Sequence, residues 1–243
     1  MKRYIRPSWR FPVIVAVLLF ALSGCAYPKE QRTENQVALK EHVLVVQSAV
    51  DQFQKSTGVL PIQNSAMNTP IYEKYIIDFK RLKDKHALSQ IPTSAFENGG
   101  TSIYVLVNVE EKPEVKLMDL GAYQQTNGLQ QEVDAYRKAH GGALPAGESA
   151  GKSFYRLDFS KLGRPVEQVR SPYSTILLGY LVHESGRVTI DYAPEIARFL
   201  TQKGITSPDP SADLRAYLVA DSLYVPVKSD PYYWRNNEPL ISE

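Results

Sequence analysis

The stretch VDQFQK at residues 50–55, with Gly58 and Leu60-Pro61 after it, decides the fold. It returns 83 residues later as VDAYRK at residues 133–138, followed by Gly141 and Leu144-Pro145. Each copy closes an amphipathic run with a glycine, which predicts two helices that end in the same way. The recurrence indicates an internal duplication.

Further blocks follow each copy in the same order. YIIDFKRL at residues 75–82 corresponds to YRLDFSKL at residues 155–162. We interpret Asp78 and Asp158, which these blocks share, as helix caps or turn ligands within each unit. Strand-like stretches come next, at residues 102–109 and 114–120 in the first copy, and at residues 175–183 and 187–192 in the second. Turn residues between the second pair predict a β-hairpin.

These patterns predict an α+β fold in which two tandem helix-plus-β-hairpin repeats pack together, with a C-terminal helical extension. The expected long helix of the first repeat runs from Glu34 to Lys55, after a capping box at Thr33. In the C-terminal part we expect helices at residues 194–203 and 211–220, an edge strand at residues 223–227 and an irregular aromatic tail. The predicted divisions are a signal peptide 1–24, a linker 25–33, repeats 34–121 and 122–193, and an extension 194–243.

The N-terminus has the pattern of an export signal. Met1 to Arg10 is basic, and the apolar run from Phe11 to Leu22 has 12 residues. As a helix this run would cover roughly 18 Å, less than the ~30 Å hydrocarbon core of a bilayer. That length favours a signal peptide over a transmembrane span.

Leu22-Ser23-Gly24-Cys25 is typical of a lipobox, in which a peptidase cleaves between Gly24 and Cys25. Cys25 is the only cysteine of the chain. We expect a diacylglyceryl group on its thiol to hold the protein on the outer face of the plasma membrane, or on the outer membrane in a Gram-negative host. The signal region and the chain length resemble the small lipoproteins of Bacillus-type bacteria, the YphF-like family. The resemblance implies a membrane-anchored envelope protein.

The charge balance argues against nucleic acid as a partner. The chain has 28 Lys and Arg against 26 Asp and Glu, and four of the basic residues precede Cys25. The part from Cys25 onward therefore has 24 basic residues and a formal charge of −2. Such a chain lacks the positive surface on which phosphate neutralisation depends.

Short motifs of the chain do not support catalysis in their context. AGESAGKS at residues 146–153 has similarities to a phosphate-binding loop and to a Gly-x-Ser-x-Gly nucleophile elbow around Ser149. A helix end precedes it where both motifs need a strand, so we expect a flexible loop. The four histidines lack the spacing of zinc ligands. We therefore predict no catalytic residue, no metal ligand and no cofactor.

Tyr232, Tyr233 and Trp234 are the candidate ligand-binding residues. Flat rings beside Arg235 and two asparagines suit sugar faces and their hydroxyl groups. The alternative is that the rings pack across the edge of the domain and close its core.

The leading functional hypothesis is a non-enzymatic binding or interaction module of the cell envelope, which recognises an envelope protein or a wall polymer at the surface between its two repeats. One alternative is a hydrolase that acts on the cell wall, using Ser149 or carboxylates such as Glu184 and Asp191. Another is a solute-binding lipoprotein.

Overall fold

The computed structural model describes residues 29–242, with the side chains of residues 29–36 excepted. The predicted signal peptide, the cleavage site and the lipid attachment at Cys25 lie outside the described residues. The internal contacts of the chain divide it into two units, Met1–Lys40 and Glu41–Glu243. The described part of the first unit is helical. The following paragraphs concern the second unit, except where the helix that runs through the boundary is named.

The fold is α+β, as the sequence predicts. The helices are α2 (Lys29–Thr57), α3 (Ile71–Lys74), α4 (Phe79–Asp84), the 3₁₀ helix η1 (Phe96–Asn98), α5 (Leu120–Ala139), α6 (Ala193–Gln202) and α7 (Arg215–Ala220). The strands are β1 (Ser102–Val107), β2 (Glu114–Asp119), β3 (Ala146–Gly151), β4 (Phe154–Leu157), β5 (Val169–Arg170), β6 (Leu177–Leu178), β7 (Tyr180–His183), β8 (Val188–Ile190), β9 (Tyr232–Arg235) and β10 (Glu238–Ile241).

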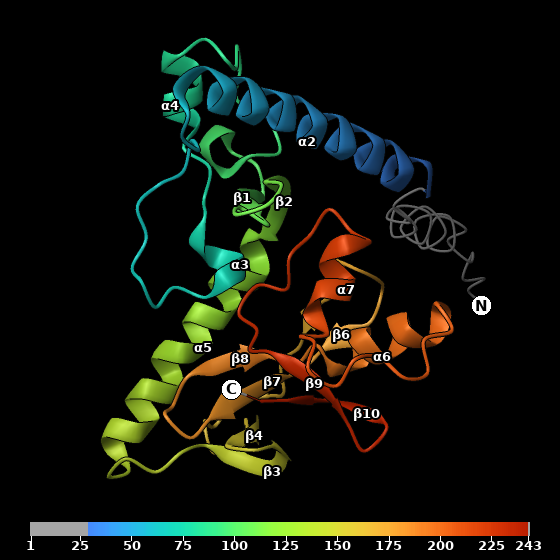
Figure 1. Cartoon of the computed structure of the whole chain (residues 1–243). Helices are drawn as coiled ribbons and strands as arrows, with labels where there is room; N and C mark the ends of the chain where they lie inside the picture. The colour runs from blue at the N-terminus through green and yellow to red at the C-terminus, as the bar shows by residue number, and fades with distance from the viewer. Residues whose placement is uncertain (1–28, 243) are drawn as a thin grey trace, which may run out of the picture. The chain divides into compact units, whose positions relative to one another are not determined.

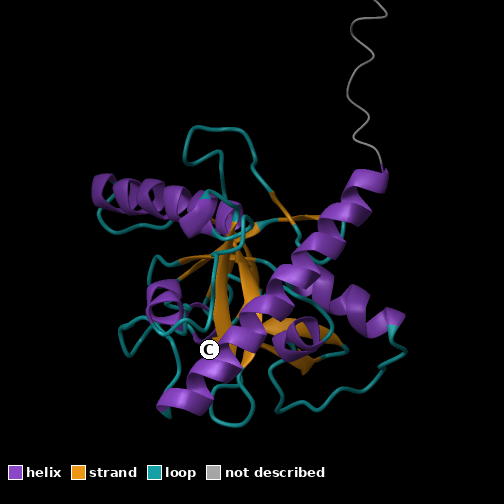
Figure 2. Ribbon diagram, turned by 90° about the horizontal axis from the view of Figure 1, so that it is seen from above, coloured by secondary structure: helices purple, strands orange, loops and turns teal. Residues whose placement is uncertain are grey.

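The strands form a hairpin of β1 and β2, a six-stranded sheet in the order β8-β7-β4-β3-β10-β9, and a small pair of β5 and β6. All neighbours are antiparallel except β3 and β10, which pair in parallel. In Figure 1, α5 leads from the β1–β2 hairpin to the six-stranded sheet. Figure 2 shows the strands, in orange, together in the middle of the view. The C-terminal strands β9 and β10 thus belong to the same sheet as β7 and β8.

The long N-terminal helix ends where it is expected and begins earlier. Gly58 has φ of +76° and its N–H bonds to the Gln54 carbonyl at 2.8 Å, so it terminates α2 in the left-handed conformation. The predicted start at Glu34 is wrong, because α2 already begins at Lys29. The preceding Lys-Glu-Gln-Arg run consists of good helix formers that continue the helix, and the predicted linker is therefore partly helical.

Three expectations for the rest of the chain need correction. Residues 146–153 form β3 and its turn, because β4 and β10 supply partners that the local sequence does not reveal. The aromatic tail, predicted irregular, is strand β9. Helix α7 begins at Arg215 instead of residue 211. The Ser211 N–H and hydroxyl both bond to the Asp209 carboxylate, and this turn replaces the expected cap.

A glutamine fastens each long helix to the turn of a β-hairpin. On α2, the Gln47 amide donates to the Pro113 carbonyl at 3.1 Å and accepts from the Val115 N–H at 2.7 Å. On α5, Gln130 donates to the Gly186 carbonyl at 2.9 Å and accepts from the Val188 N–H at 2.7 Å. Each glutamine satisfies a backbone donor and a backbone acceptor of its hairpin.

The segment after each helix is also held alike. The Asp78 N–H donates to the Pro61 carbonyl, and the Asp158 N–H to the Pro145 carbonyl, both at 2.8 Å. The side chain of each aspartate accepts a nearby backbone N–H, as the sequence predicts. The next residue is a phenylalanine packed edge-on against a hairpin tyrosine, in the pairs Phe79–Tyr104 and Phe159–Tyr180.

The C-terminal segment, residues 219–230, bonds to both hairpins. Beside β2, Leu117 donates to the Leu223 carbonyl and accepts from the Val225 N–H. Beside β8, the Ile190 N–H donates to the Lys228 carbonyl at 2.7 Å. The predicted edge strand at residues 223–227 is accordingly reduced to a single parallel bridge with β2. The segment joins the two hairpins with backbone hydrogen bonds.

The raised pKa values of four tyrosines indicate that the protein loses stability in alkaline solution. Burial raises the pKa of Tyr180 to about 12, and it raises the pKa values of Tyr173, Tyr192 and Tyr232 well above 10. Above about pH 10 these groups ionise in the unfolded chain before they ionise in the folded one. Each should therefore lower the free energy of unfolding by about 1.4 kcal/mol per pH unit above pH 10, a contribution that is fully present below that pH.

Urea denaturation at pH 9, 10 and 11 measures this dependence. Tyr180→Phe should reduce the alkaline slope by the share of one tyrosine. Tyr233→Phe is the comparison variant, because Tyr233 lies partly exposed. The alkaline slopes of the two variants should differ. Equal slopes in wild type and Tyr180→Phe would contradict the assignment.

Candidate functional site

A pocket of about 390 Å³, called the polar pocket below, lies between α3, α5, β8 and the C-terminal segment. Its volume is within the range of small-molecule sites. The loop before α3 and α3 itself form one wall, α5 forms another, and β8 with the C-terminal segment closes the floor. The lining residues are Asn68, Pro70, Glu73, Thr126, Asn127, Gln130, Arg187, Val188, Thr189, Lys228 and Ser229.

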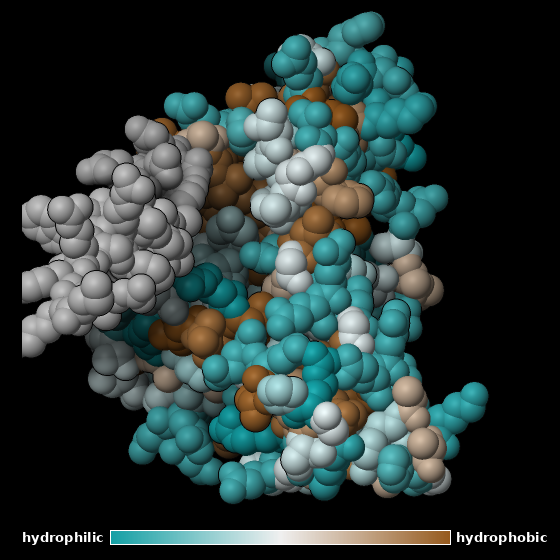
Figure 3. All heavy atoms as spheres, turned by 180° about the vertical axis from the view of Figure 1, so that it is seen from behind, coloured by the Kyte–Doolittle hydropathy of each residue, from teal (hydrophilic) through white to brown (hydrophobic). Residues whose placement is uncertain are grey.

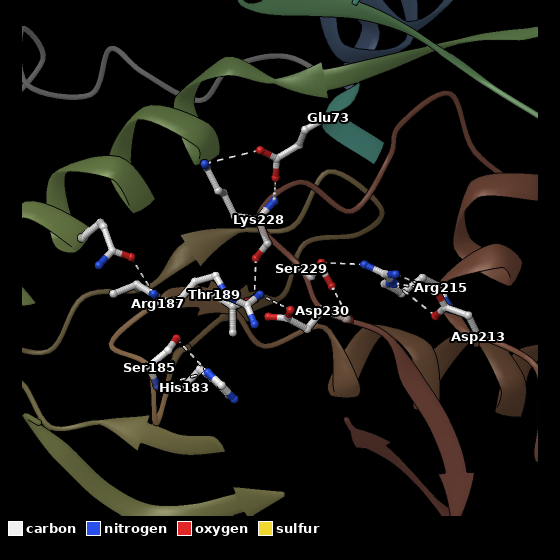
Figure 4. Close-up of polar contacts among 12 residues, drawn as sticks. Glu73, His183, Ser185, Arg187, Thr189, Asp213, Arg215, Lys228, Ser229 and Asp230 are labelled. Carbon is white, nitrogen blue, oxygen red and sulfur yellow. Dashed lines mark hydrogen bonds and ion pairs between the residues drawn. The ribbon is translucent and has the colours of Figure 1, made fainter. Parts of the chain in front are cut away.

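Lys228 is the most constrained residue of the polar pocket. Its φ of +52° is in the left-handed region, which non-glycine residues seldom adopt. Its N–H donates to the Glu73 carboxylate at 2.7 Å, and its carbonyl accepts from the Ile190 N–H and the Thr189 hydroxyl. The ammonium lies 3.4 Å from Glu73 Oε2 and 4.2 Å from the ring centroid of Tyr123. Figure 4 shows the contacts of Lys228 with Glu73 and Thr189.

A second ion pair lies beside the first. Arg187 donates to the Asp230 carboxylate, and the Arg187 side chain is 42% exposed against 9% for Asp230. Thr189 lies between the two pairs and bonds to the Lys228 carbonyl at 2.6 Å. Glu73 and Asp230 are both buried, and Glu73 also lines the polar pocket.

The exposed hydrophobic residues are a weaker indication of a binding site than the polar pocket. On the face drawn in Figure 3, brown hydrophobic residues are interspersed with teal hydrophilic ones. Scattered exposed apolar side chains are normal for soluble domains and indicate no partner by themselves.

The three candidate aromatic residues do not form one platform. Tyr232 is fully buried, and its hydroxyl donates to Asp191 at 3.3 Å and accepts from the Tyr192 N–H at 3.0 Å. Tyr233 and Trp234 are partly exposed. Neighbouring side chains of β9 point to opposite faces of the sheet, so the three rings cannot stack on one ligand together.

The residues of the hydrolase alternative lie on different elements. Ser149 is exposed on β3, and its hydroxyl donates to the Gly151 carbonyl at 3.3 Å. Asp191 is buried, where its Oδ1 accepts from the Ala193 N–H and the Tyr232 hydroxyl. Glu184 is exposed at the β7–β8 turn. Contacts of this kind position a turn and a helix start.

Within residues 29–242, no group of three or more His, Cys, Asp or Glu side chains is placed to hold a metal ion. None of the helices in that range combines the length and the apolar character needed to cross a membrane.

Residues 39–119 match the YphF family N-terminal domain. The predicted YphF-like resemblance is confirmed over this third of the chain. No curated protein and no solved structure matches the chain.

The YphF-type stretch ends at Asp119, the last residue of β2 and the N-cap of α5. It contributes Asn68, Pro70 and Glu73 to the polar pocket. The other lining residues come from the part of the chain beyond the match. The polar pocket therefore joins the YphF-type stretch to the segment that follows it.

The sequence analysis names none of the lining residues of the polar pocket as a candidate site residue. Gln130 could have been found, since it lies 83 residues after Gln47, the same offset as the quoted repeat. Glu73 and Lys228 have no signal of this kind, because 155 positions separate them in the sequence.

Proposed function

We propose that this chain is a lipid-anchored, non-enzymatic binding module of the cell envelope, built from two tandem helix-plus-β-hairpin repeats, and that its ligand or partner enters the polar pocket. The observation that carries the proposal is the composition of the polar pocket. Residues of both proposed repeats and of the C-terminal segment line it together. A surface assembled from three parts of the chain is typical of ligand sites, which occur preferentially where structural units meet.

Contacts that recur in the two proposed repeats support an internal duplication. The two glutamines bond to equivalent hairpin positions, and the two aspartate–proline bonds have the same length. The two edge-on ring pairs add a third correspondence in tertiary structure.

Substitution of the two glutamines tests the duplication directly. Gln47→Ala and Gln130→Ala should each lower the free energy of unfolding by about 1–2 kcal/mol, since each leaves a hairpin N–H and carbonyl without its partner. Urea denaturation monitored by circular dichroism measures the change. The matched controls are Gln52→Ala and Gln124→Ala, on the exposed faces of the same helices. A large cost at one glutamine and none at the other would argue against equivalent roles.

The lipid anchor rests on the lipobox residues Leu22 to Cys25. Cells grown with a labelled fatty acid should incorporate the label into the wild-type protein and not into Cys25→Ser. The wild-type protein should sediment with membranes. Absence of label from the wild-type protein would refute the anchor.

Binding at the polar pocket can be tested in the same cells. A photo-crosslinking amino acid at Asn127, which lines the pocket, should give a covalent adduct on illumination. The same amino acid at Gln124, one helical turn away and exposed, should give none. Adducts from both positions, or from neither, would contradict recognition at this site.

A further inference from the structure

The chemistry of the polar pocket narrows its ligand. Two opposite charges face each other at each ion pair, Glu73 with Lys228 and Asp230 with Arg187. An ionic ligand would either meet a like charge or have to separate one of these pairs. Separating a pair leaves a carboxylate buried without its partner, which is unfavourable. Each cation is thus already neutralised by its own carboxylate, and this favours an uncharged ligand.

Uncharged polar groups make up much of the remaining lining. The side-chain amides of Asn68 and Asn127 form no hydrogen bond to any other described residue. Each amide has donors on its nitrogen and an acceptor on its oxygen. An apolar ligand would cover these groups without satisfying them, so the lining selects against it.

The Lys228–Glu73 pair also presents a donor beside an acceptor. Lys228 Nζ lies 3.4 Å from Glu73 Oε2. A hydroxyl group donates one hydrogen bond and accepts others, so neighbouring hydroxyls can bond to both members of the pair. The same hydroxyls suit the amides of the two asparagines.

Lys228 is held in position before any ligand arrives. Its backbone N–H and carbonyl are both engaged, and its ammonium lies over the Tyr123 ring. A strained backbone conformation persists only where the surrounding structure fixes it, and such residues cluster at ligand sites. A donor fixed in this way loses little freedom on binding.

We infer that the polar pocket binds a neutral sugar unit. This assignment rests on the proposed function and deepens it by naming the class of ligand. The hydroxyl groups of the sugar bond to Asn127, Asn68 and the Lys228–Glu73 pair, while both ion pairs remain intact. The volume of about 390 Å³ accommodates a ligand of small-molecule size.

Ligand-observed NMR on the full chain tests the inference, in a detergent that contains no sugar. The probes are N-acetylglucosamine and glucose, with inorganic phosphate and acetate as ionic probes. At least one of the sugars should show saturation transfer and a saturable titration. Its affinity should change less than about twofold between low and high NaCl, because no net charge is neutralised. The ionic probes should not bind.

Two variants locate the sugar. Asn127→Ala should weaken binding about threefold to tenfold, the effect of one neutral hydrogen bond. Lys228→Asn should weaken it about tenfold to a hundredfold, because it removes a charged donor. Asparagine tolerates the left-handed conformation better than other non-glycine residues, so the backbone at residue 228 should be kept, while loss of the ion pair to Glu73 should lower the free energy of unfolding. Gln124→Ala is the matched control and should bind as the wild type does, and circular dichroism verifies folding of all three.

Three results would overturn the inference: binding of neither sugar, binding of phosphate or acetate instead, or equal sugar affinity in wild type and both pocket variants. If Asn127 still gives its covalent adduct in cells, the proposed function survives such a failure and only the ligand class is refuted. If sugar binds as expected but no adduct forms in cells, the ligand class stands and the proposed function fails.

Discussion

Replacement of Arg215 by methionine is expected to lower the free energy of unfolding by about 3 kcal/mol. The Arg215 side chain is only 5% exposed, and its guanidinium bonds to Asp213 through Nε and Nη2. Its Nη1 donates to the Ser229 carbonyl, and its charge lies 5.0 Å from the ring centroid of Tyr72. Loss of one member of a buried ion pair leaves the other charged and uncompensated, which costs about 3–5 kcal/mol. The partial exposure of Asp213 places the effect at the lower end.

Urea denaturation of three variants separates charge from geometry. Arg215→Lys keeps the charge but cannot bond to the carboxylate through two nitrogens, so an intermediate loss is expected. Arg170→Met is the control, since Arg170 is exposed, and it should stay within about 0.5 kcal/mol of the wild type. If Arg215→Met were as stable as Arg170→Met, the ion pair would have no structural role.

Gly100→Ala should have an effect of similar size, for a steric reason. A Cβ atom at Gly100 would lie 2.1 Å from the carbonyl carbon and oxygen of Ser94, so the backbone would have to move. Ser94 also bonds through its hydroxyl to Tyr104 at 2.7 Å and to His42 at 3.0 Å. A shift of Ser94 would strain both bonds. Overpacking of a close contact costs typically 1–3 kcal/mol, and contact with rigid backbone points to about 3 kcal/mol.

The same substitution at Gly128 should have the opposite sign. Gly128 lies on the exposed face of α5, and nothing is within 4 Å of an added Cβ. Alanine in a helix interior is favoured over glycine by about 0.5–1 kcal/mol. Thermal and urea denaturation should therefore show Gly128→Ala stabilised and Gly100→Ala destabilised. Changes of the same sign in both would contradict the steric argument.

The sequence predicted elements whose signals are local. Gly58 ends α2, the turn after β7 joins it to β8, and Pro194 stands at the start of α6, all as expected. In each case the residue that decides the conformation lies within the element or beside it. Hydrophobic periodicity and turn chemistry were therefore sufficient.

Elements that depend on distant partners were missed. Strand β3 carries small and polar residues and exists because β4 and β10 lie on either side of it. The hairpin of β9 and β10 did have a local signal. Asn236 and Asn237 have φ of +52° and +63°, the conformation of a tight two-residue turn that asparagine favours. The two asparagines therefore make a hairpin of the stretch that the sequence analysis interprets as an irregular tail.

The sequence could not place the polar pocket, because its residues come from distant parts of the chain. Its residues meet through tertiary contacts, such as the bond between the Lys228 N–H and Glu73. No local pattern specifies a lysine in the left-handed conformation or the carboxylate that holds it. The pairing of Lys228 with Glu73 and of Arg187 with Asp230 depends on tertiary distances, which no local pattern of the sequence gives.

The C-terminal segment and β10 have a consequence for the order in which this protein can mature. A chain that emerges amino-terminus first, from a ribosome or a translocation channel, presents β2, β8 and β3 long before the C-terminal residues that bond to them. Leu117 and Ile190 can form their hydrogen bonds to the C-terminal segment only after residues 223–228 have emerged. Gly151 can pair with Ile241 only after β10 has emerged. Contacts of such long sequence separation form slowly. Emergence of residues 223–241 is thus the step that lets the sheet close, and until then the nascent chain exposes open strand edges for chaperones to shield.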